Sequence, residues 1–298
     1  MLRISYIPLI WKLSTIIVIP KPNKPKNEIT SYRPISLLPT LAKLFEKIIR
    51  LRIRPILQTF NIIPHSQFGF RTGHSTIHQI HRLTDQIASL FEKKQYCPGV
   101  FLYVAQAFDR VWHKGLLFKL KMFLPAPYFL IICSYLENRT YTVRYGNSVS
   151  SFYPIKAGVP QGSDLSPDLF NVYTADIPKT PNTVMATYAD DTAILSHGND
   201  PVKTVHFLQT HLDLIDKWSS NWKIKINPDK SIYVPFTLKK SISLPLYFQG
   251  IQIPISSEST PLTSPNSEIK ITLPHKNNHP QILITAYLGL CYSNLGMR

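Results

Sequence analysis

The segment TYADDTAIL, residues 187–195, places two aspartates side by side between two apolar stretches. Val184–Tyr188 and Thr192–Leu195 both have the composition of β-strands, so the pattern predicts a hairpin with Asp190 and Asp191 at its tip. A buried, unpaired carboxylate is costly, and two adjacent carboxylates repel each other. Two readings follow. The pair is an ordinary Asp-Asp turn bonded to its own backbone, or a divalent cation such as Mg²⁺ neutralises it.

Charge and apolar content limit the classes of protein that fit. The chain has 298 residues, is 44% hydrophobic and carries a formal net charge of +16, which indicates a polyanionic partner. The longest uncharged apolar run, Met122–Leu136, is too short to span a bilayer and contains two prolines. The first residues lack a signal-peptide pattern, so we expect an intracellular protein, in cytoplasm or nucleus, that does not bind membranes.

The three cysteines do not form a metal-binding or disulfide pattern. Cys97, Cys133 and Cys291 are far apart in the sequence, so their spacing fits neither a zinc site nor a disulfide framework. A reducing compartment is therefore expected.

Hydrophobic periodicity predicts an α+β protein with strands grouped around residues 99–104 and 183–196 and helices packed behind them. The expected helices are 39–60, 74–93, 112–123, 128–137, 166–176 and 207–222, and the other expected strands are 14–20, 140–145, 149–155 and 232–236. Residues 21–38, rich in Lys and Pro, are expected to form a loop, and residues 256–279 read as linker or disorder.

Five further segments carry chemistry-bearing residues: SYRPISLL, SQFGFRTGHST, FLYVAQAFDRVWHKGLLFKL, AGVPQGSDLSPDLFN and INPDKS. Each has an ordinary explanation alone: Arg33 can lead into a helix, GVPQGS can be a simple turn, and Asp109 can be a solvated strand end. In this order, and together with TYADD, they are specific. Over about residues 8–253 the chain resembles the reverse transcriptase domain of non-LTR retrotransposons, especially the jockey-like group.

This resemblance implies a right-hand polymerase fold with fingers and palm, the palm being an antiparallel sheet backed by helices. We assign residues 1–98 to a fingers-like segment, 99–253 to the palm, and 254–298 to a degenerate, disordered tail. The implied reaction is RNA-directed DNA synthesis, in which a primer 3′-hydroxyl attacks a dNTP with two Mg²⁺ ions, or Mn²⁺ as the substitute, at the site. The implied partners are an RNA template, a DNA primer and dNTP. The family's endonuclease and full thumb, parts of a parent polyprotein, are expected to be missing.

The resemblance also implies site residues. Asp190 and Asp191 match the metal-binding pair, with Asp190 the better-supported ligand. Phe108 matches an aromatic that excludes a 2′-hydroxyl, with core packing as the alternative. The nucleotide-binding set is completed by Gly158, Gln161 and Gly162 of the PQG loop, by Arg33 as a triphosphate clamp, by Arg71 as an assistant, and by Lys230, which is either a proton donor to the leaving pyrophosphate or a solvated loop lysine.

One position departs from the family pattern. With Phe108 in register, the third metal-binding carboxylate is replaced by Tyr103. A phenol with a pKa of about 10 does not replace a bridging carboxylate near neutral pH. Asp109 lies six residues further on and is a poor substitute. A single base change converts Asp to Tyr, which fits a decayed copy or a sequence error.

Two aspartates stand where the family has apolar residues. Asp164 and Asp168 are expected to cost stability if they are buried. We therefore predict a reverse transcriptase domain that is crippled at Tyr103. A non-catalytic nucleic-acid-binding remnant is the alternative. A metal-dependent phosphohydrolase explains none of the fingers motifs.

Overall fold

The computed structural model describes residues 3–20, 25, 27–28, 31–237, 239 and 244–256. Two compact units emerge from the contacts between residues, and each is discontinuous in sequence. The first unit comprises residues 1–64, 106–176 and 222–224, and the second comprises 65–105, 177–221 and 225–298. The contiguous fingers and palm boundary at residues 98 and 99 stays a prediction.

The sheet of the first unit has the strand order β2-β1-β4-β5, with β6 also paired to β4. Strand β1 pairs antiparallel with β2 and parallel with β4. The strands are β1 (Leu13–Pro20), β2 (Tyr32–Leu37), β4 (Thr140–Tyr145), β5 (Ser148–Val149) and β6 (Tyr153–Pro154). β1 and the hairpin of β4 lie close to their predicted positions.

The expectation of a loop throughout residues 21–38 is wrong, because β2 lies within that range. Pro34 sits in β2 opposite Val18 of β1. A proline lacks the N–H needed in a central strand, but β2 is at the edge of its sheet, where that N–H is dispensable. Pro34 is therefore compatible with the edge strand that the structure shows.

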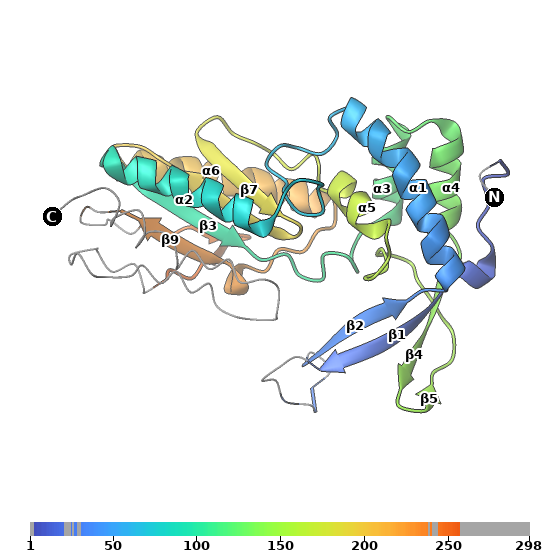
Figure 1. Ribbon diagram of the computed structural model, residues 1–298. Helices are drawn as coiled ribbons and strands as arrows, with labels where there is room; N and C mark the ends of the chain where they lie inside the picture. The colour runs from blue at the N-terminus through green and yellow to red at the C-terminus, as the bar shows by residue number, and fades with distance from the viewer. Residues whose placement is uncertain are drawn as a thin grey trace. The chain divides into compact units, whose positions relative to one another are not determined.

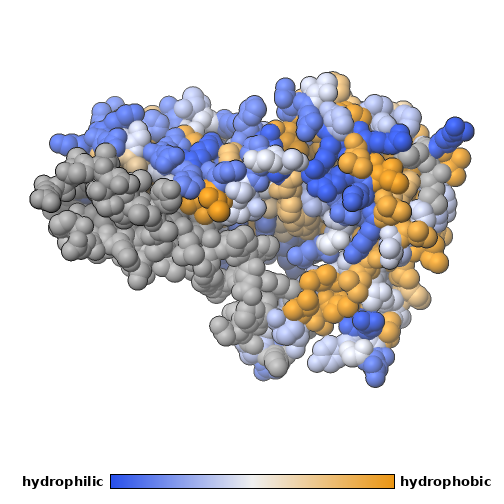
Figure 2. Space-filling view, in the orientation of Figure 1, coloured by the Kyte–Doolittle hydropathy of each residue, from blue (hydrophilic) through white to orange (hydrophobic). Residues whose placement is uncertain are grey.

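The helices of the first unit surround one apolar core. They are α1 (Thr40–Thr59), α3 (His113–Lys121), α4 (Ala126–Leu136) and α5 (Ser166–Tyr173), preceded by the short 3₁₀ helix η1 (Leu9–Trp11). Fully buried Ile49, Leu116, Ile131 and Leu165 bring one residue from each helix region into this core. Figure 2 shows hydrophobic residues on the outer surface of α1 as well, where Leu41, Leu44 and Leu51 are exposed.

The sheet of the second unit is antiparallel throughout, in the order β7-β8-β3-β9. Its strands are β3 (Cys97–Leu102), β7 (Thr183–Tyr188), β8 (Asp191–Ser196) and β9 (Ile232–Phe236). Alternate residues of a strand face opposite sides of a sheet. Leu83 and Ile87 of helix α2 pack against Ala193 and Leu195 of β8, so these positions define the face that α2 covers.

Helix α2 (Thr76–Glu92) lies on one side of this sheet and helix α6 (Pro201–Asn221) on the other (Figure 1). Helix α6 starts six residues before its predicted start. The Asp200 side chain accepts hydrogen bonds from the backbone N–H groups of Val202 and Lys203, at 2.9 and 3.3 Å, and so caps the helix there. The short strands β10 (Tyr247–Phe248) and β11 (Ile251–Gln252) form a separate hairpin.

The expected α+β fold class is confirmed. No helix in the described part of the chain has the length and apolar character needed to cross a membrane. The expected disordered tail lies, from residue 257 onward, outside the described residues.

Candidate active site

The predicted hairpin at the two aspartates is present. β7 and β8 pair from Thr183–Ser196 to Tyr188–Asp191, which leaves Ala189 and Asp190 as the two residues of the turn. Both aspartate side chains are half-buried. The turn at the ends of β7 and β8 therefore leaves the two carboxylates partly accessible to solvent, so their desolvation is only partial.

Tyr103 follows the last residue of β3 and lies beside this hairpin. β3 pairs with β8 up to Leu102 and Thr192, so the register extended by one residue sets Tyr103 opposite Asp191. β3 pairs with β9 only up to Phe101 and Ile232, and the chain then changes register, so that Tyr103 accepts from the Asn227 N–H and Val104 bridges to Ile226. By alternation Tyr103 and Asp191 fall on the α2 side of the sheet, and opposed residues in such a sheet have Cα atoms about 4.5–5.5 Å apart.

Lys230 contacts Tyr103 through its side chain. The Lys230 ammonium lies 5.2 Å from the centre of the Tyr103 ring, within the range of a cation–π interaction. Lys230 itself is exposed and ends the short 3₁₀ helix η3 (Pro228–Lys230). Tyr103 is thus placed between an acidic and a basic residue.

The backbone of Tyr103 is fixed by the INPDKS segment. Its N–H donates to Ser231 Oγ at 3.1 Å, and its carbonyl accepts from the Asn227 N–H at 2.9 Å. The Ser231 hydroxyl in turn donates to the Asn227 carbonyl at 2.8 Å. Sequence reasoning singled out only Lys230 here, although the segment NPDKS contains these two anchors as well.

Arg71 also lies in the second unit. Its guanidinium donates from Nη1 to the Gln67 carbonyl at 3.2 Å, which ties the side chain to its own loop. Its predicted part in nucleotide binding stays a prediction.

The PQG loop lies in the first unit, where two glycines have positive φ. Gly158 has a φ of +90°, and a Cβ there would lie 2.7 Å from the Asp109 carbonyl oxygen. Gly162 has a φ of +111°, and a Cβ there would lie 3.0 Å from the Ser36 carbonyl oxygen. Both positions therefore require glycine. The Gln161 carbonyl accepts from the Ser36 N–H at 3.1 Å, which pairs the loop with β2.

A half-buried histidine supports the same loop and was not predicted. The Gly158 carbonyl lies 2.7 Å from His113 Nε2, and since a carbonyl only accepts, Nε2 must carry the proton. Burial lowers the pKa of His113. Gly158 and Val159 also donate to the carbonyls of Val111 and Phe108, each at 2.8 Å, so the loop runs beside the segment that carries Phe108.

Phe108 and Arg33 belong to the first unit too. Phe108 is half-buried against the core and stacks on Phe170, with ring centres 4.8 Å apart and an angle of 22° between the planes. This contact gives Phe108 a packing role and leaves its proposed role as a sugar gate open. Arg33 lies in β2, opposite Ile19 of β1.

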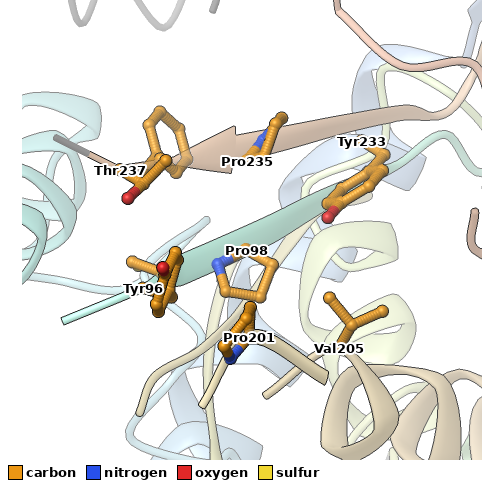
Figure 3. A pocket seen from close by; sticks show the side chains of 9 residues that line it. Tyr96, Pro98, Pro201, Val205, Tyr233, Pro235 and Thr237 are labelled. Atoms are coloured by element: carbon orange, nitrogen blue, oxygen red, sulfur yellow. The ribbon is translucent and has the colours of Figure 1, made fainter. Parts of the chain in front are cut away.

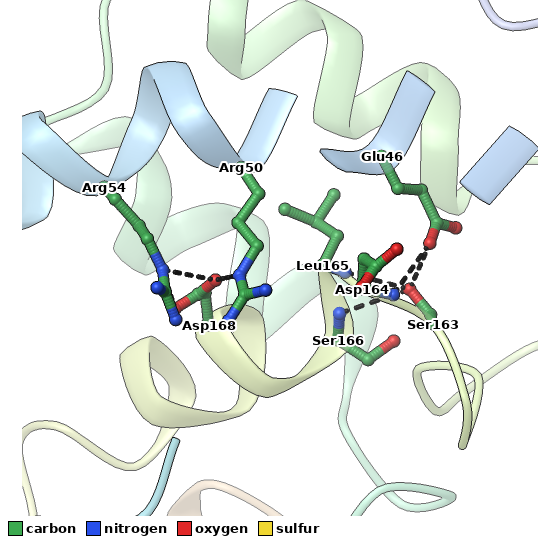
Figure 4. A network of polar contacts seen from close by, with 8 residues as sticks. All are labelled: Glu46, Arg50, Arg54, Ser163, Asp164, Leu165, Ser166 and Asp168. Atoms are coloured by element: carbon green, nitrogen blue, oxygen red, sulfur yellow. Dashed lines mark hydrogen bonds and ion pairs between the residues drawn. The ribbon is translucent and has the colours of Figure 1, made fainter. Parts of the chain in front are cut away.

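Asp168 is buried, as the expected cost to stability requires, but α1 supplies partners that offset this cost. Its side chain is 5% exposed and bonds the Nε atoms of Arg50 at 2.8 Å and Arg54 at 3.2 Å (Figure 4). Asp164 is only half-buried, so its desolvation is partial.

The same network holds the start of α5. Glu46 of α1, 2% exposed, accepts from the Tyr135 hydroxyl at 2.8 Å and the Ser163 hydroxyl at 2.7 Å. Ser163 Oγ in turn accepts from the N–H groups of Leu165 and Ser166, at 3.1 and 3.3 Å, which caps the first turn of the helix. One buried carboxylate on α1 thus fixes the residue that follows Gly162.

No group of three or more His, Cys, Asp or Glu side chains is placed to hold a metal ion among the described residues. Asp190 and Asp191 offer the oxygen donors that Mg²⁺ prefers. The resemblance implies a third carboxylate at the position of Tyr103, and a phenol does not supply it, so the residues present do not fit the complete two-metal site that the resemblance implies.

A pocket lies elsewhere in the second unit, between β3, β9 and the start of α6 (Figure 3). Its lining is mostly apolar and aromatic, and none of the predicted site residues belongs to it: Tyr96, Cys97, Pro98, Pro201, Val205, Tyr233, Pro235, Phe236 and Thr237. Burial raises the pKa of the Cys97 thiol to about 12, which keeps it protonated and unreactive.

Comparisons with known proteins agree with this geometry. Residues 19–253 match the reverse transcriptase (RNA-dependent DNA polymerase) family. The chain is 45% identical over 261 residues to the probable RNA-directed DNA polymerase from transposon BS of Drosophila melanogaster, covering 84% of this chain and 29% of that protein. It is 42% identical over 243 residues to the RNA-directed DNA polymerase from mobile element jockey of the same species, covering 79% and 26%.

A solved structure shares the fold. Telomerase from Candida tropicalis, in complex with a TWJ fragment of telomeric RNA, aligns with a TM-score of 0.55 and 12% identity, covering 89% of this chain and 47% of that chain. The Drosophila relatives are much longer proteins, and this chain spans less than a third of their length.

Proposed function

The chain belongs to the reverse transcriptase family, and we propose on that premise that it is the RNA-directed DNA polymerase domain of a jockey-like non-LTR retrotransposon, crippled in its chemistry by Tyr103. Its fold is that of polymerase fingers and palm. The partners that we propose are an RNA template, a DNA primer and dNTP.

The observation that carries this proposal is the β3–β8 pairing up to Leu102 and Thr192, because the next residues along the two strands are Tyr103 and Asp191. The residues that the proposal assigns to the site besides the missing carboxylate are present: Asp190 and Asp191 on the hairpin, and Lys230 in contact with the Tyr103 ring. The two half-buried aspartates offer the carboxylate oxygens that Mg²⁺ prefers. The arrangement therefore supports an inherited metal site that lacks one ligand.

Each remaining site residue keeps a role that does not depend on the missing ligand. Arg33 and Arg71 have planar guanidinium groups suited to a triphosphate. The missing Cβ atoms of Gly158 and Gly162 let the PQG loop pack against the backbone of Asp109 and Ser36, which holds the loop that we propose supports the base pair. Phe108 limits the space beneath the sugar, and Lys230 is a proton source near the leaving phosphate. Binding of duplex and nucleotide should therefore survive, although synthesis does not.

The proposal is tested by labelled-primer extension on poly(rA)/oligo(dT), comparing the chain as it is with Tyr103→Asp. We expect no product above background from the Tyr103 form, because loss of one preorganised electrostatic group already costs about 10²–10³ in rate. Tyr103→Asp should give measurable extension that Asp190→Ala abolishes. Robust synthesis by the Tyr103 form, abolished by Asp190→Ala, would show that the assignment of residue 103 is wrong.

A second readout does not depend on activity. In Tyr103→Asp two carboxylates lie opposite each other, which destabilises the sheet unless a cation lies between them. Mn²⁺ should therefore raise the unfolding temperature of Tyr103→Asp in a concentration-dependent way, through mass action on the folded state. Tyr103→Asn, which matches Asp in size without the charge, is the control and should gain little.

The alternative is a non-catalytic nucleic-acid-binding remnant. The net charge of +16 favours it as much as it favours the polymerase. The two proposals separate in the Tyr103→Asp form: a remnant binds duplex and yields no product in either form.

A further inference from the structure

The side chain of Gln67 is bonded to the turn that carries the two aspartates. Its Oε1 accepts from the Ala189 N–H at 2.9 Å, and its Nε2 donates to the Ala189 carbonyl at 3.1 Å. One amide thus satisfies both backbone polar groups of the residue that precedes Asp190. Gln67 is buried, with 4% of its surface exposed, so water competes little for these bonds.

Ala189 adopts a backbone conformation that alanine disfavours. Its φ is +57°, in the left-handed region, where an L-residue brings its Cβ close to a carbonyl oxygen. Such a conformation persists only where the surroundings hold it. The two bonds from Gln67 supply that constraint, and they act on the residue that sets the direction of Asp190 and Asp191.

Gly69 completes the arrangement. Its N–H donates to the same Gln67 Oε1 at 2.7 Å, which fixes the amide. A Cβ on Gly69 would lie 2.1 Å from the Ala189 nitrogen and 2.8 Å from its Cα, so a larger residue would displace the turn. The segment SQFG thus fits the turn in two ways. The Gln67 side chain bonds Ala189, and Gly69 lacks the Cβ that would collide with Ala189.

The segment is held independently of the Gln67 amide. The Thr187 backbone N–H donates to the Ser66 carbonyl, and the Thr187 carbonyl accepts from the Phe68 N–H, each at 2.9 Å. Buried Gln79 of α2 donates to the carbonyls of Ser66 and Thr187, at 2.9 and 3.0 Å. Because these bonds already join the segment to β7, the Gln67 side chain is not needed to pair them.

We propose that Gln67 is a positioning residue for the polymerase site, which holds Ala189 in its left-handed conformation and so fixes Asp190 and Asp191. The inference rests on the proposed function for its consequence in catalysis. The effect on the turn itself does not depend on that function.

The test uses the full chain and three changes. Gln67→Leu keeps much of the side-chain volume and removes all three bonds. Gln67→Glu keeps the acceptor for Ala189 and Gly69, replaces the donor with a second oxygen that faces the Ala189 carbonyl, and adds a negative charge when it is ionised. Ala189→Gly, combined with Gln67→Leu, relieves the left-handed strain at its source, because glycine adopts this φ freely.

The first readout is residue-resolved amide hydrogen exchange, with Tyr103 unchanged. We expect the Ala189 N–H to exchange at least tenfold faster in Gln67→Leu and close to the wild-type rate in Gln67→Glu, which retains its acceptor. The Thr187 N–H, bonded to Ser66, should be protected in all variants. Equal protection of Ala189 in the wild type and in Gln67→Leu overturns the proposal, as does equal loss of protection at Thr187, which indicates general unfolding of the segment.

The second readout is primer extension in the Tyr103→Asp background. Gln67→Leu should lower kcat about tenfold and leave the KM for dNTP and the duplex Kd within twofold. Adding Ala189→Gly to Gln67→Leu should raise kcat at least threefold above that of Gln67→Leu alone. A purely structural role of Gln67 would not be rescued by a change in the turn. If Tyr103→Asp itself makes no product, the proposed function fails at its chemistry, while hydrogen exchange still decides the role of Gln67.

Gly69 provides a matched pair of variants. Gly69→Ala inserts a Cβ against Ala189 and should raise the exchange of its N–H at least tenfold. Gly73→Ala is the control in the same loop, because Gly73 has a φ of +75° and open space around its Cβ position. It introduces comparable backbone strain without touching the turn, so protection of Ala189 should stay within twofold of the wild type.

Discussion

The Lys230 ammonium lies 5.2 Å from the centre of the Tyr103 ring, at the position where resemblance to reverse transcriptases implies a carboxylate. In this chain Lys230 therefore contacts an aromatic ring instead of a carboxylate. An exposed cation–π contact is worth about 0.5–1 kcal/mol. The lysine therefore has a modest stabilising role in this chain, separate from the proton transfer that we propose for an active form.

Lys230→Met separates these two roles. In the Tyr103 form it should lower the free energy of unfolding by about 0.5–1 kcal/mol, because only the ring contact is lost. In the Tyr103→Asp form it should lower kcat about 10²-fold with little change in KM, as expected for loss of a general acid. Chemical denaturation and primer extension measure the two effects. Lys225→Met, at an exposed lysine nearby, is the control, and an equal loss of kcat there would remove the special role of Lys230.

Phe108→Val tests the sugar gate in the Tyr103→Asp form. Removal of bulk beneath the 2′ carbon should raise incorporation of rNTP relative to dNTP by at least tenfold. The change also removes the stacking on Phe170, which is worth about 0.5–1.5 kcal/mol beyond its buried area. Incorporation ratios and thermal unfolding are measured together. A lower unfolding temperature with an unchanged ratio would assign Phe108 to the core alone.

Asp168→Asn tests the paired carboxylate of the first unit. The change removes a charge that bonds Arg50 and Arg54, and hydrogen bonds to charged groups contribute about 1.5–3 kcal/mol. Each arginine side chain is about a quarter exposed and regains some hydration, so we expect a loss of about 2 kcal/mol in the free energy of unfolding. Asp164→Asn, four residues away and half-buried, should change it by less than about 0.5 kcal/mol. Equal effects would show that the ion pairs contribute nothing specific.

The contrast between Asp168 and the YADD hairpin explains how far the sequence could be read. Period-two alternation is local, so β7, β8 and the turn between them were predictable from a few residues. The partners of Asp168, Arg50 and Arg54, lie 118 and 114 residues away on α1, and no local sequence pattern identifies them. A buried charge in a sequence therefore indicates a partner without identifying it.

Gln67 and Pro34 mark two other limits. Gln67 bonds the backbone of Ala189, 122 residues away. Since nearly every residue offers the same backbone groups, the sequence does not show which residue is the partner. Pro34 lies in a segment that was predicted to be a loop, but an edge strand tolerates a proline, and edge position depends on the order of strands in the sheet. Motif order identified the family because it carries information that single residues lack, and the site residues that it implies stay predictions.

Duplex binding should depend strongly on salt. A net charge of +16 makes contact with several phosphates the expected mode of binding, and each neutralised phosphate contributes about −0.9 to the slope of log affinity against log salt. If about four or more are neutralised, the slope for a primer–template duplex should be about −3 or steeper, without sequence preference. Fluorescence anisotropy at several salt concentrations gives the slope. A value near zero would contradict nucleic-acid binding in both the polymerase and the remnant proposals.

Acid should destabilise the second unit through His211. This residue of α6 is fully buried, and burial lowers its pKa from the ordinary 6.5. Its Nε2 lies 2.9 Å from the Pro178 carbonyl and must donate there, so Nδ1 accepts from the Thr183 hydroxyl at 2.6 Å. Protonation of Nδ1 would remove that acceptor, so the folded state favours the neutral ring.

The sign of the pH dependence follows from that preference. Below about pH 6.5 the unfolded chain binds a proton that the folded chain resists, so stability falls as the pH falls, by at most about 1.4 kcal/mol per pH unit from this residue. Denaturation between pH 7 and pH 5 should show a shallower pH dependence in His211→Gln, whose amide cannot titrate, even if its stability at pH 7 is lower. His206→Gln, at an exposed histidine of the same helix, should keep the wild-type slope. A wild-type slope in His211→Gln would assign the acid sensitivity to other groups.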